Sequence, residues 1–216
     1  MENDERTFVP LPPEADFDFA RKAVSYAEKL FSKDSGGHDL AHSMRVLRNA
    51  VEIARTEDGV DFEVVVLASL LHDVDDRKLF RTENFGNARR FLESEGVEPE
   101  RVERIVRAIS EVSFGVNGSK SPSSIESAVV RDADRLDALG AIGVARTFAY
   151  GGSVGRPLED SIRHFEEKLL LLKDLMVTAE GRRLAERRHS FLVEFLREYG
   201  SETGIDVPVE PQGFRS

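Results

Sequence analysis

The sequence predicts an all-α fold, a compact bundle of about eight or nine helices. Two observations support this prediction. Apolar residues recur at helical spacing in most segments between glycine and proline breaks, and no segment alternates convincingly between apolar and polar residues as a half-buried strand would. The most apolar stretch, residues 64–71, has seven apolar residues in eight and no Gly or Pro. It therefore predicts a helix that is buried on all sides.

The length of 216 residues fits one domain of ordinary size. Three prolines at positions 10, 12 and 13 oppose a helix there, so residues 1–14 are predicted to form a flexible arm. Residues 15–200 form the predicted domain. Residues 201–216, which include two further prolines, form the predicted C-terminal tail.

Five helices are predicted in the first half of the chain. Asp61 is the expected cap of the third helix, which runs to about Val74, and Gly96 is the expected end of the fourth. Pro99 suits the first turn of the fifth. The five helices are expected to begin near residues 15, 38, 62, 83 and 99.

The second half begins with a loop over residues 114–122. Ser123 and Glu126 have the spacing of a capping box before one or two helices over residues 125–149, interrupted near Gly140 and Gly143. Residues 150–157 contain three glycines and predict a mobile or tightly turned loop, a candidate lid. Two amphipathic helices are expected to follow, over residues 162–176 and 179–199.

Composition excludes several kinds of function. The chain has no Cys, which excludes disulfides, thiolate metal sites and cysteine nucleophiles. With 30 Lys and Arg against 40 Asp and Glu, the formal net charge is -10, so a nucleic acid polymer is not an expected partner. The acidic, Pro-containing N-terminus resembles neither a signal peptide nor a membrane span, and a cytoplasmic location is expected.

Side chains that suit a metal site occur at three places. His42 lies beside an apolar stripe of its predicted helix, the pair His72-Asp73 directly follows the apolar run, and one acidic residue is expected from the segment RDADRLDA at 131–138. Within that segment Asp132, Asp134 and Asp137 compete. Two imidazoles and two carboxylates suit Mn, Fe, Co, Ni or Zn better than Mg or Ca, and two carboxylates offset a divalent charge.

Each of these signals also has a structural interpretation. A single His on an amphipathic helix is usually a satisfied structural residue, and His164 and His189 are placed in that group. A His-Asp pair at a helix end often caps or pairs locally, and residues 131–137 fit a solvated face. The combination favours a site, because buried polar groups without partners cost about 1 to 3 kcal/mol each.

The motifs HSMRV at His42, LLHDVDD at His72-Asp73 and DADRLDA at Asp134 resemble, in this order, the signature of the HD-domain phosphohydrolase superfamily. The stretches GHDLAH, LLHDVDDRK, DADRLDALGAIGVARTFAYGG and HFEEKLLLLKDLM look like its branch of small single-domain bacterial and archaeal hydrolases. The resemblance covers roughly residues 17–199 and implies the HD-domain fold.

The resemblance implies that one divalent metal is bound by His42, His72, Asp73 and Asp134. Manganese is the leading candidate, with Fe, Co, Ni, Zn and Mg as alternatives. Asp134 is preferred because Arg135 follows it, as a basic residue follows the last ligand in the family. Asp132 and Asp134 differ by about 200° around a helix, so only one of them can point inward. Asp137, three residues after Asp134, is expected to support a ligand from behind.

The resemblance also assigns other residues near the metal. Asp76 occupies the place of an acidic residue that activates water or protonates the leaving group, and Lys78 and Arg135 look like phosphate contacts. A surface ion pair is the alternative for Asp76 and Lys78. His38 lies four residues before His42 and either faces the pocket or caps its helix. Val112 stands where some relatives carry a further His, which favours a mononuclear site.

The expected reaction is hydrolysis of phosphate esters or anhydrides of small molecules. By resemblance the leading substrates are nucleoside or deoxynucleoside triphosphates, cleaved to monophosphate and pyrophosphate, and dephosphorylation of nucleoside monophosphates comes next. Cyclic dinucleotides and sugar phosphates are further options, although the GYP extension of cyclic-dinucleotide hydrolases is absent. The non-enzymatic alternative is a metal-stabilised nucleotide-binding sensor. Apolar positions on the last two helices are compatible with a homodimer.

Overall fold

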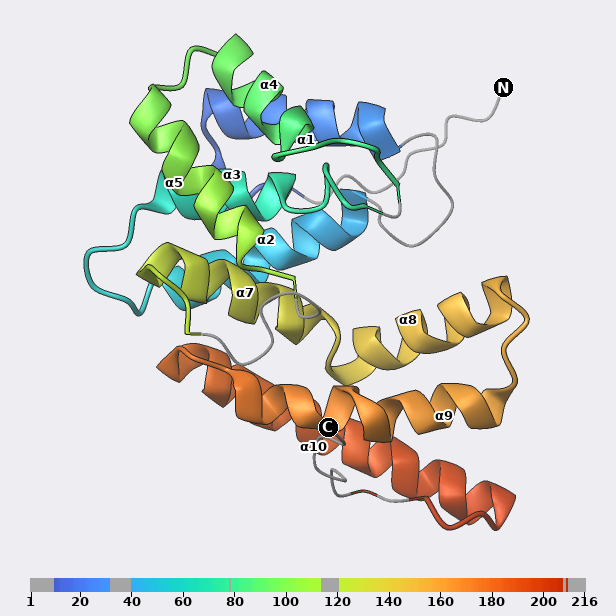
Figure 1. Ribbon diagram of the computed structural model, residues 1–216. Coiled ribbons are helices and arrows are strands. Elements are labelled where there is room, and N and C mark those ends of the chain that lie inside the picture. The colour runs from blue at the N-terminus through green and yellow to red at the C-terminus, as the bar shows by residue number, and fades with distance from the viewer. Residues whose placement is uncertain (1–9, 32–39, 78, 114–120, 208, 210–216) are drawn as a thin grey trace.

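The computed structural model describes residues 10–31, 40–77, 79–113, 121–207 and 209. Within these ranges the chain forms nine α-helices, two 3-10 helices and no strand, which confirms the all-α prediction. Figure 1 shows α1 to α5 on one side, α8 to α10 on the other, and α7 between them. The elements are η1 (Pro13–Ala15), α1 (Asp18–Phe31), α2 (Leu40–Ala54), α3 (Phe62–Leu71), α4 (Gly86–Ser94), α5 (Pro99–Ser110), α7 (Ile125–Asp137), α8 (Gly140–Ser153), α9 (Leu158–Glu167), η2 (Leu169–Leu175) and α10 (Ala179–Thr203).

Helix α3 is the centre of the hydrophobic core. Every residue from Val64 to Leu71 is at most 1% exposed, and α1, α2, α5 and α7 pack around the helix. Its start is the predicted one, because the Asp61 side chain accepts a hydrogen bond from Val64 N at 3.3 Å. The helix ends at Leu71, three residues earlier than predicted, and His72 follows as its C-cap. The polar pair His72-Asp73 is therefore attached to the most deeply buried helix.

Helix α7 starts differently from the prediction. Its cap is Ser124, whose hydroxyl accepts a hydrogen bond from Ser127 N at 3.1 Å, and not Ser123. The carboxylate of Glu126 does not complete a capping box, because it accepts bonds from Asp61 N and from the Arg104 guanidinium. Tertiary contacts thus decide which serine caps the helix.

The chain breaks between α7 and α8, where the two glycines predicted an interruption. Gly140 has a φ of 70°, a conformation that favours glycine. Gly143 lies inside α8, and a Cβ at this position would collide with the carbonyl oxygen of Ala138. The two glycines therefore serve different purposes, one for the turn and one for a close backbone approach.

The first half of the predicted glycine loop at residues 150–157 is helical. Helix α8 continues through Ser153, and only residues 154–157 connect it to α9. A Cβ on Gly151 would lie 2.6 Å from the Ser161 hydroxyl oxygen, so glycine permits α8 and α9 to pack closely at this point. The prediction of a glycine-rich lid over the whole segment is wrong for residues 150–153.

The last two helices also differ in their bounds. The predicted helix over residues 162–176 is divided at Lys168 into α9 and the 3-10 helix η2. Helix α10 passes through Gly200, the last residue of the predicted domain, and ends at Thr203, with Gly204 as its C-cap at a φ of 71°. Gly200 is required for another reason, because a Cβ there would lie 2.9 Å from the Ile205 carbonyl oxygen.

The boundaries of the arm, the domain and the tail stay predictions. The described end of the arm contacts the domain: Leu11 packs against the core, and Glu14 accepts two hydrogen bonds of 2.8 Å from the Arg55 guanidinium. Much of the predicted loop at residues 114–122 lies outside the described residues. None of the helices in the described part of the chain combines the length and the apolar character that crossing a membrane requires.

Candidate metal centre

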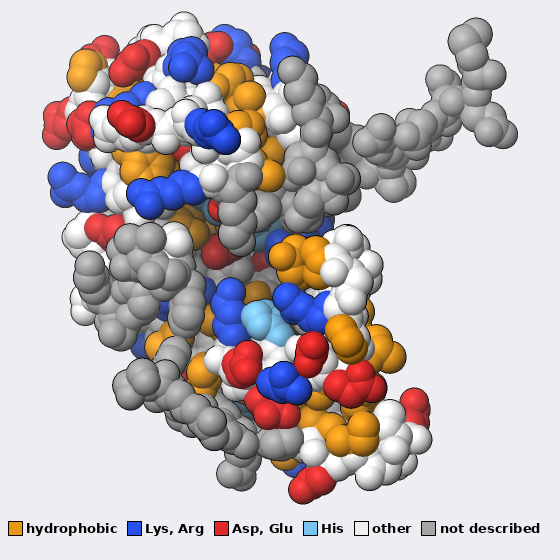
Figure 2. All heavy atoms as spheres, turned by 45° about the vertical axis from the view of Figure 1, so that its right-hand side comes forward, with side chains coloured by type: hydrophobic (Ala, Val, Ile, Leu, Met, Phe, Trp, Pro, Cys, Tyr) orange, Lys and Arg blue, Asp and Glu red, His pale blue; other side chains and the backbone are white. Residues whose placement is uncertain are grey.

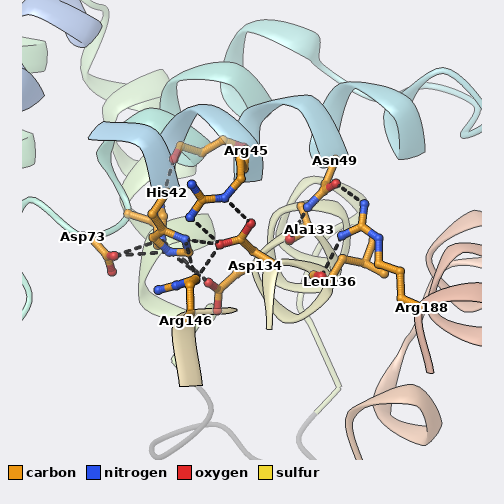
Figure 3. A network of polar contacts seen from close by, with 12 residues as sticks. His42, Arg45, Asn49, Asp73, Ala133, Asp134, Leu136, Arg146 and Arg188 are labelled. Atoms are coloured by element: carbon orange, nitrogen blue, oxygen red, sulfur yellow. Dashed lines mark hydrogen bonds and ion pairs between the residues drawn. The ribbon is translucent and has the colours of Figure 1, made fainter. Parts of the chain in front are cut away.

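Four predicted donors from three parts of the chain converge between α2, α3 and α7 (Figure 3). The Nε2 atoms of His42 and His72 are 3.2 Å apart. One carboxylate oxygen of Asp73 lies 3.4 Å from each of these nitrogens. An oxygen of Asp134 lies 3.4 Å from His42 Nε2 and 3.9 Å from His72 Nε2. The structure therefore brings together the residues that sequence motifs place 92 positions apart, from His42 to Asp134.

Both imidazoles are held so that Nε2 faces the cluster. His72 Nδ1 donates a hydrogen bond to the backbone oxygen of Ser69 at 2.8 Å, which leaves Nε2 as the acceptor nitrogen. His42 Nδ1 lies 2.7 Å from the Asp137 carboxylate, and this contact likewise turns Nε2 of His42 toward the cluster. When both rings are neutral, their two Nε2 lone pairs therefore point at one place, as ligation of a cation requires.

The spacing of the donors suits a metal ion. Imidazole and carboxylate ligands lie about 2.0 to 2.2 Å from a transition metal, so neighbouring donors at octahedral or tetrahedral angles lie about 2.8 to 3.6 Å apart. Most of the observed separations fall within this range. The donor atoms of His42, His72 and Asp134 all lie within 4.8 Å of one another, and the Asp73 carboxylate approaches both imidazoles. The residues present therefore fit a divalent transition metal in donor type and in distance.

Charge in the cluster favours cations. Burial lowers the pKa of His72, but the carboxylates of Asp73 and Asp134 outweigh this and raise its pKa to about 9. The pKa of His42 is likewise lowered by burial and raised overall by Asp134 and Asp137. Burial raises the pKa of Asp134, yet the two imidazoles hold that pKa below its ordinary value. The carboxylates thus stabilise positive charge at the point where a metal would be bound.

The Asp137 carboxylate lies behind His42, on the side of the ring away from the cluster, and its supporting role stays a prediction. Asp137 is 1% exposed, and its carboxylate accepts hydrogen bonds from three side chains. Besides His42, these are Arg45 at 2.7 and 3.1 Å and Arg146 at 2.5 Å. Burial alone would raise the pKa of Asp137, but these partners hold that pKa far below its usual value. Asp137 therefore remains charged and orients His42.

Sequence reasoning did not identify Arg45 and Arg146. Arg45 comes three residues after His42, so the two share a helix face, and this spacing was an available signal. Arg146 comes from α8 and its guanidinium Nη1 lies 3.0 Å from His42 Nδ1. No local pattern connects positions separated by 104 residues.

The three competing aspartates have separate locations. Asp134 joins the two imidazoles and Asp137 lies behind His42, while Asp132 points to the start of α10. There the Asp132 carboxylate accepts bonds from Val177 N at 2.9 Å and from the backbone and hydroxyl of Thr178 at 2.8 Å. Burial still raises the pKa of Asp132 despite these bonds. Its role is to join α7 to the last helix.

The remaining predicted residues are only partly located. Asp76 is half-buried on the turn after the His-Asp pair, and its backbone N donates to the carbonyl of Asp73 at 3.0 Å. Arg135 is 4% exposed and its guanidinium donates to the Leu175 carbonyl, so its described bond gives no support to a phosphate contact. Lys78 and His38 lie outside the described residues. The predicted roles of these four residues stay predictions.

Comparison with known proteins shows the family of the chain. Residues 39–139 match the family described as HD domain, a segment that contains all four donors. The chain belongs to the HD-domain superfamily of hydrolases, whose members bind a divalent metal. The uncharacterized protein YpgQ of Bacillus subtilis is 38% identical over an alignment of 197 residues, which covers 87% of this chain and 96% of YpgQ.

Solved structures show the same fold at similar length. The crystal structure of Bacillus subtilis YpgQ in complex with ADP has a TM-score of 0.73 and 35% identity, covering 85% of this chain and 97% of the other. A HD-superfamily hydrolase from Bacillus thuringiensis has a TM-score of 0.72 and 36% identity, covering 87% and 97%. Each of these alignments covers at least 85% of both chains, which agrees with the predicted similarity to small single-domain hydrolases.

Proposed function

We propose that this protein is a metal-dependent phosphohydrolase of nucleotides, with His42, His72, Asp73 and Asp134 as ligands of one divalent ion. The leading reaction is cleavage of nucleoside or deoxynucleoside triphosphates to monophosphate and pyrophosphate. The convergence of two oriented Nε2 atoms and two carboxylates carries the proposal. The nucleotide part is supported by the structure of YpgQ, which is a complex with ADP.

The proposed mechanism assigns a task to each group of residues. A divalent metal would supply Lewis-acid activation of water and offset the charge of the phosphate. The Nδ1 contacts to Ser69 and Asp137 keep both imidazoles in the tautomer that ligation requires. In the reaction a bond forms between water oxygen and the α-phosphorus, and the bond to the leaving pyrophosphate breaks. Asp76, beside Asp73, is the proposed proton carrier.

Positive side chains near the centre are suited to the substrate. Arg146 is bonded to Asp137 and its Nη1 lies 3.0 Å from His42 Nδ1, yet its side chain is 36% exposed. Figure 2 shows charged side chains of both signs around a hollow between the two halves of the molecule. We assign Arg146 to the non-bridging oxygens of the phosphate chain, together with the predicted Lys78.

The test uses the full-length protein loaded with Mn2+ and incubated with nucleoside mono-, di- and triphosphates and with generic phosphate esters. Asp73→Ala should lose metal and turnover together, because it removes one of the four ligands. Asp75→Asn is the matched control on the same turn. The Asp75 carboxylate accepts bonds from the Thr82 hydroxyl and from two amides at the start of α4, so its variant should keep the metal.

The outcomes distinguish the alternatives. Monophosphate and pyrophosphate as products support the leading reaction, while nucleoside and orthophosphate from a monophosphate indicate the phosphatase alternative. Nucleotide binding without product from any substrate, in protein shown to contain metal, supports a sensor and contradicts hydrolysis. Full metal content in Asp73→Ala contradicts the assigned ligands.

A further inference from the structure

A second cavity lies beside the metal centre, where α2, the start of α8 and α10 meet. Its volume is about 350 Å3, within the range of small-molecule sites. None of the four proposed metal ligands is among its lining residues. Two of the lining residues, Arg45 and Asp137, also belong to the group that holds His42 in place. The cavity is lined by Arg45, Arg48, Asn49, Asp137, Leu139, Gly140, Ala141, Ile142, Arg187, Arg188 and Phe191.

The cavity is strongly positive in a protein of net charge -10. Four of its lining residues are arginines and one is a carboxylate, so four minus one leaves a formal charge of +3. That carboxylate, Asp137, is already bonded to His42, Arg45 and Arg146. Its charge is therefore largely neutralised before the other arginines of the cavity are considered.

The described hydrogen bonds of two cavity arginines go to neutral acceptors. Arg188 donates to the Leu136 carbonyl at 2.6 Å and to the Asn49 side-chain oxygen at 2.7 Å, and in Figure 3 it lies on the opposite side of the network from Asp73. Arg48 donates to the Pro10 carbonyl at 3.4 Å. Burial lowers the pKa of Arg188 even with carboxylates in its surroundings. These contacts hold two positive charges in place through neutral acceptors, without a direct ion pair among their described hydrogen bonds, as in a built anion site.

The rest of the lining agrees with a phosphate-bearing ligand. Helix α8 begins at the cavity without a side-chain cap, and Gly140 allows Arg188 to cross its first turn, since a Cβ would lie 3.3 Å from the Arg188 side chain. The amides of this first turn add partial positive charge. Phe191 and Ile142 are 45% and 42% exposed and give the cavity an apolar wall. An aromatic ring beside arginines suits the base of a nucleotide.

We propose that this cavity is a second ligand site, which binds the diphosphate group of inorganic pyrophosphate or of a nucleoside diphosphate. A diphosphate carries the negative charge that the three excess positive charges require, and its oxygens accept paired bonds from guanidinium groups. A bound diphosphate would contact Arg45, which also holds Asp137. The site is separate from the proposed hydrolysis and does not depend on it.

The test is calorimetric titration of the full-length protein with pyrophosphate, ADP and orthophosphate, each with and without a metal chelator. The second cavity should bind pyrophosphate in both conditions, whereas binding to the metal centre should require the ion. The double variant Arg48→Gln with Arg187→Gln should raise the Kd for pyrophosphate in the chelated protein by about tenfold or more, because each substitution removes a charge-assisted contact. Arg187→Gln alone, at an exposed position, is the second variant if the double variant fails to fold.

The matched control is Arg197→Gln, which removes the same charge from an exposed position of α10 outside the cavity lining. Its Kd should equal that of the wild type. Phe191→Ala separates the two sources of the ligand: weaker ADP binding with unchanged pyrophosphate binding identifies a nucleotide, and no change in either identifies the diphosphate group alone. No pyrophosphate binding in the chelated protein, equal binding by the Arg48/Arg187 variant, or an equal loss in Arg197→Gln overturns the proposal. Absence of hydrolysis leaves these measurements unaffected.

Discussion

Asp137→Asn tests whether the residue behind His42 determines metal affinity. The substitution preserves the shape of the side chain and removes its charge. The carboxylate accepts bonds from His42, Arg45 and Arg146, whereas an amide has only one acceptor oxygen. At least one donor must then face another N–H group. Loss of such a supporting contact lowers metal affinity by about 10- to 100-fold, which corresponds to about 1.4 to 2.7 kcal/mol.

The assay is calorimetric titration of Mn2+ into metal-stripped protein, with thermal denaturation in parallel. Asp132→Asn is the matched control, because Asp132 is also a buried aspartate of α7 with several bonds but does not contact an imidazole. It should lower the melting temperature and leave the Mn2+ affinity unchanged. Equal affinity of Asp137→Asn and the wild type would refute the orienting role. Equal losses of affinity in both variants would show that general destabilisation is the cause.

Three further predictions concern stability. Chelation should lower the melting temperature of the metal-loaded protein, since a ligand at 100 times its Kd stabilises the folded state by about 2.7 kcal/mol. The melting temperature of Asp73→Ala should not change on chelation. An unchanged melting temperature of the wild type would contradict the metal site. Gly143→Ala should lower the free energy of unfolding, measured in urea, by about 1 to 3 kcal/mol, because the added Cβ would clash with Ala138. Gly152→Ala in the same helix has open space around it and should raise that free energy by up to about 1 kcal/mol. A gain in stability for both variants would contradict the close contact at Gly143. Asp75→Ala should lower the same free energy by about 1 to 3 kcal/mol, and unchanged stability would argue against its bonds to α4.

The parts of the fold that local chemistry determines were predictable. An apolar run without Gly or Pro is compatible only with burial, so α3 and its Asp61 cap follow from the sequence. Because His72 directly follows this run, the run also predicts that His72 lies next to the core. His42 lies beside an apolar stripe of α2, and this places it toward the same interior.

Glycine positions show where prediction from sequence fails. A glycine that adopts a positive φ directly after a helix, such as Gly96 after α4, marks the end of that helix as local rules predict. Gly151 and Gly200 lie inside helices, where the missing Cβ makes room for Ser161 and for the returning chain at Ile205. The sequence does not distinguish the two uses, because the second depends on which segment packs against the helix. The contact of Arg146 with Asp137 was not predicted for the same reason, because it too depends on which helices pack together.

The two imidazoles have unequal partners. His42 faces a charged carboxylate through Nδ1, whereas His72 faces a neutral peptide oxygen. A carboxylate that accepts the Nδ1 hydrogen bond attracts the proton on that nitrogen and makes the Nε2 atom of the same ring the stronger electron donor. In a site loaded with a divalent ion, His42 would therefore be the stronger electron donor of the two imidazoles, and a change at Asp137 would weaken the hold on the ion more than a change at the peptide oxygen behind His72.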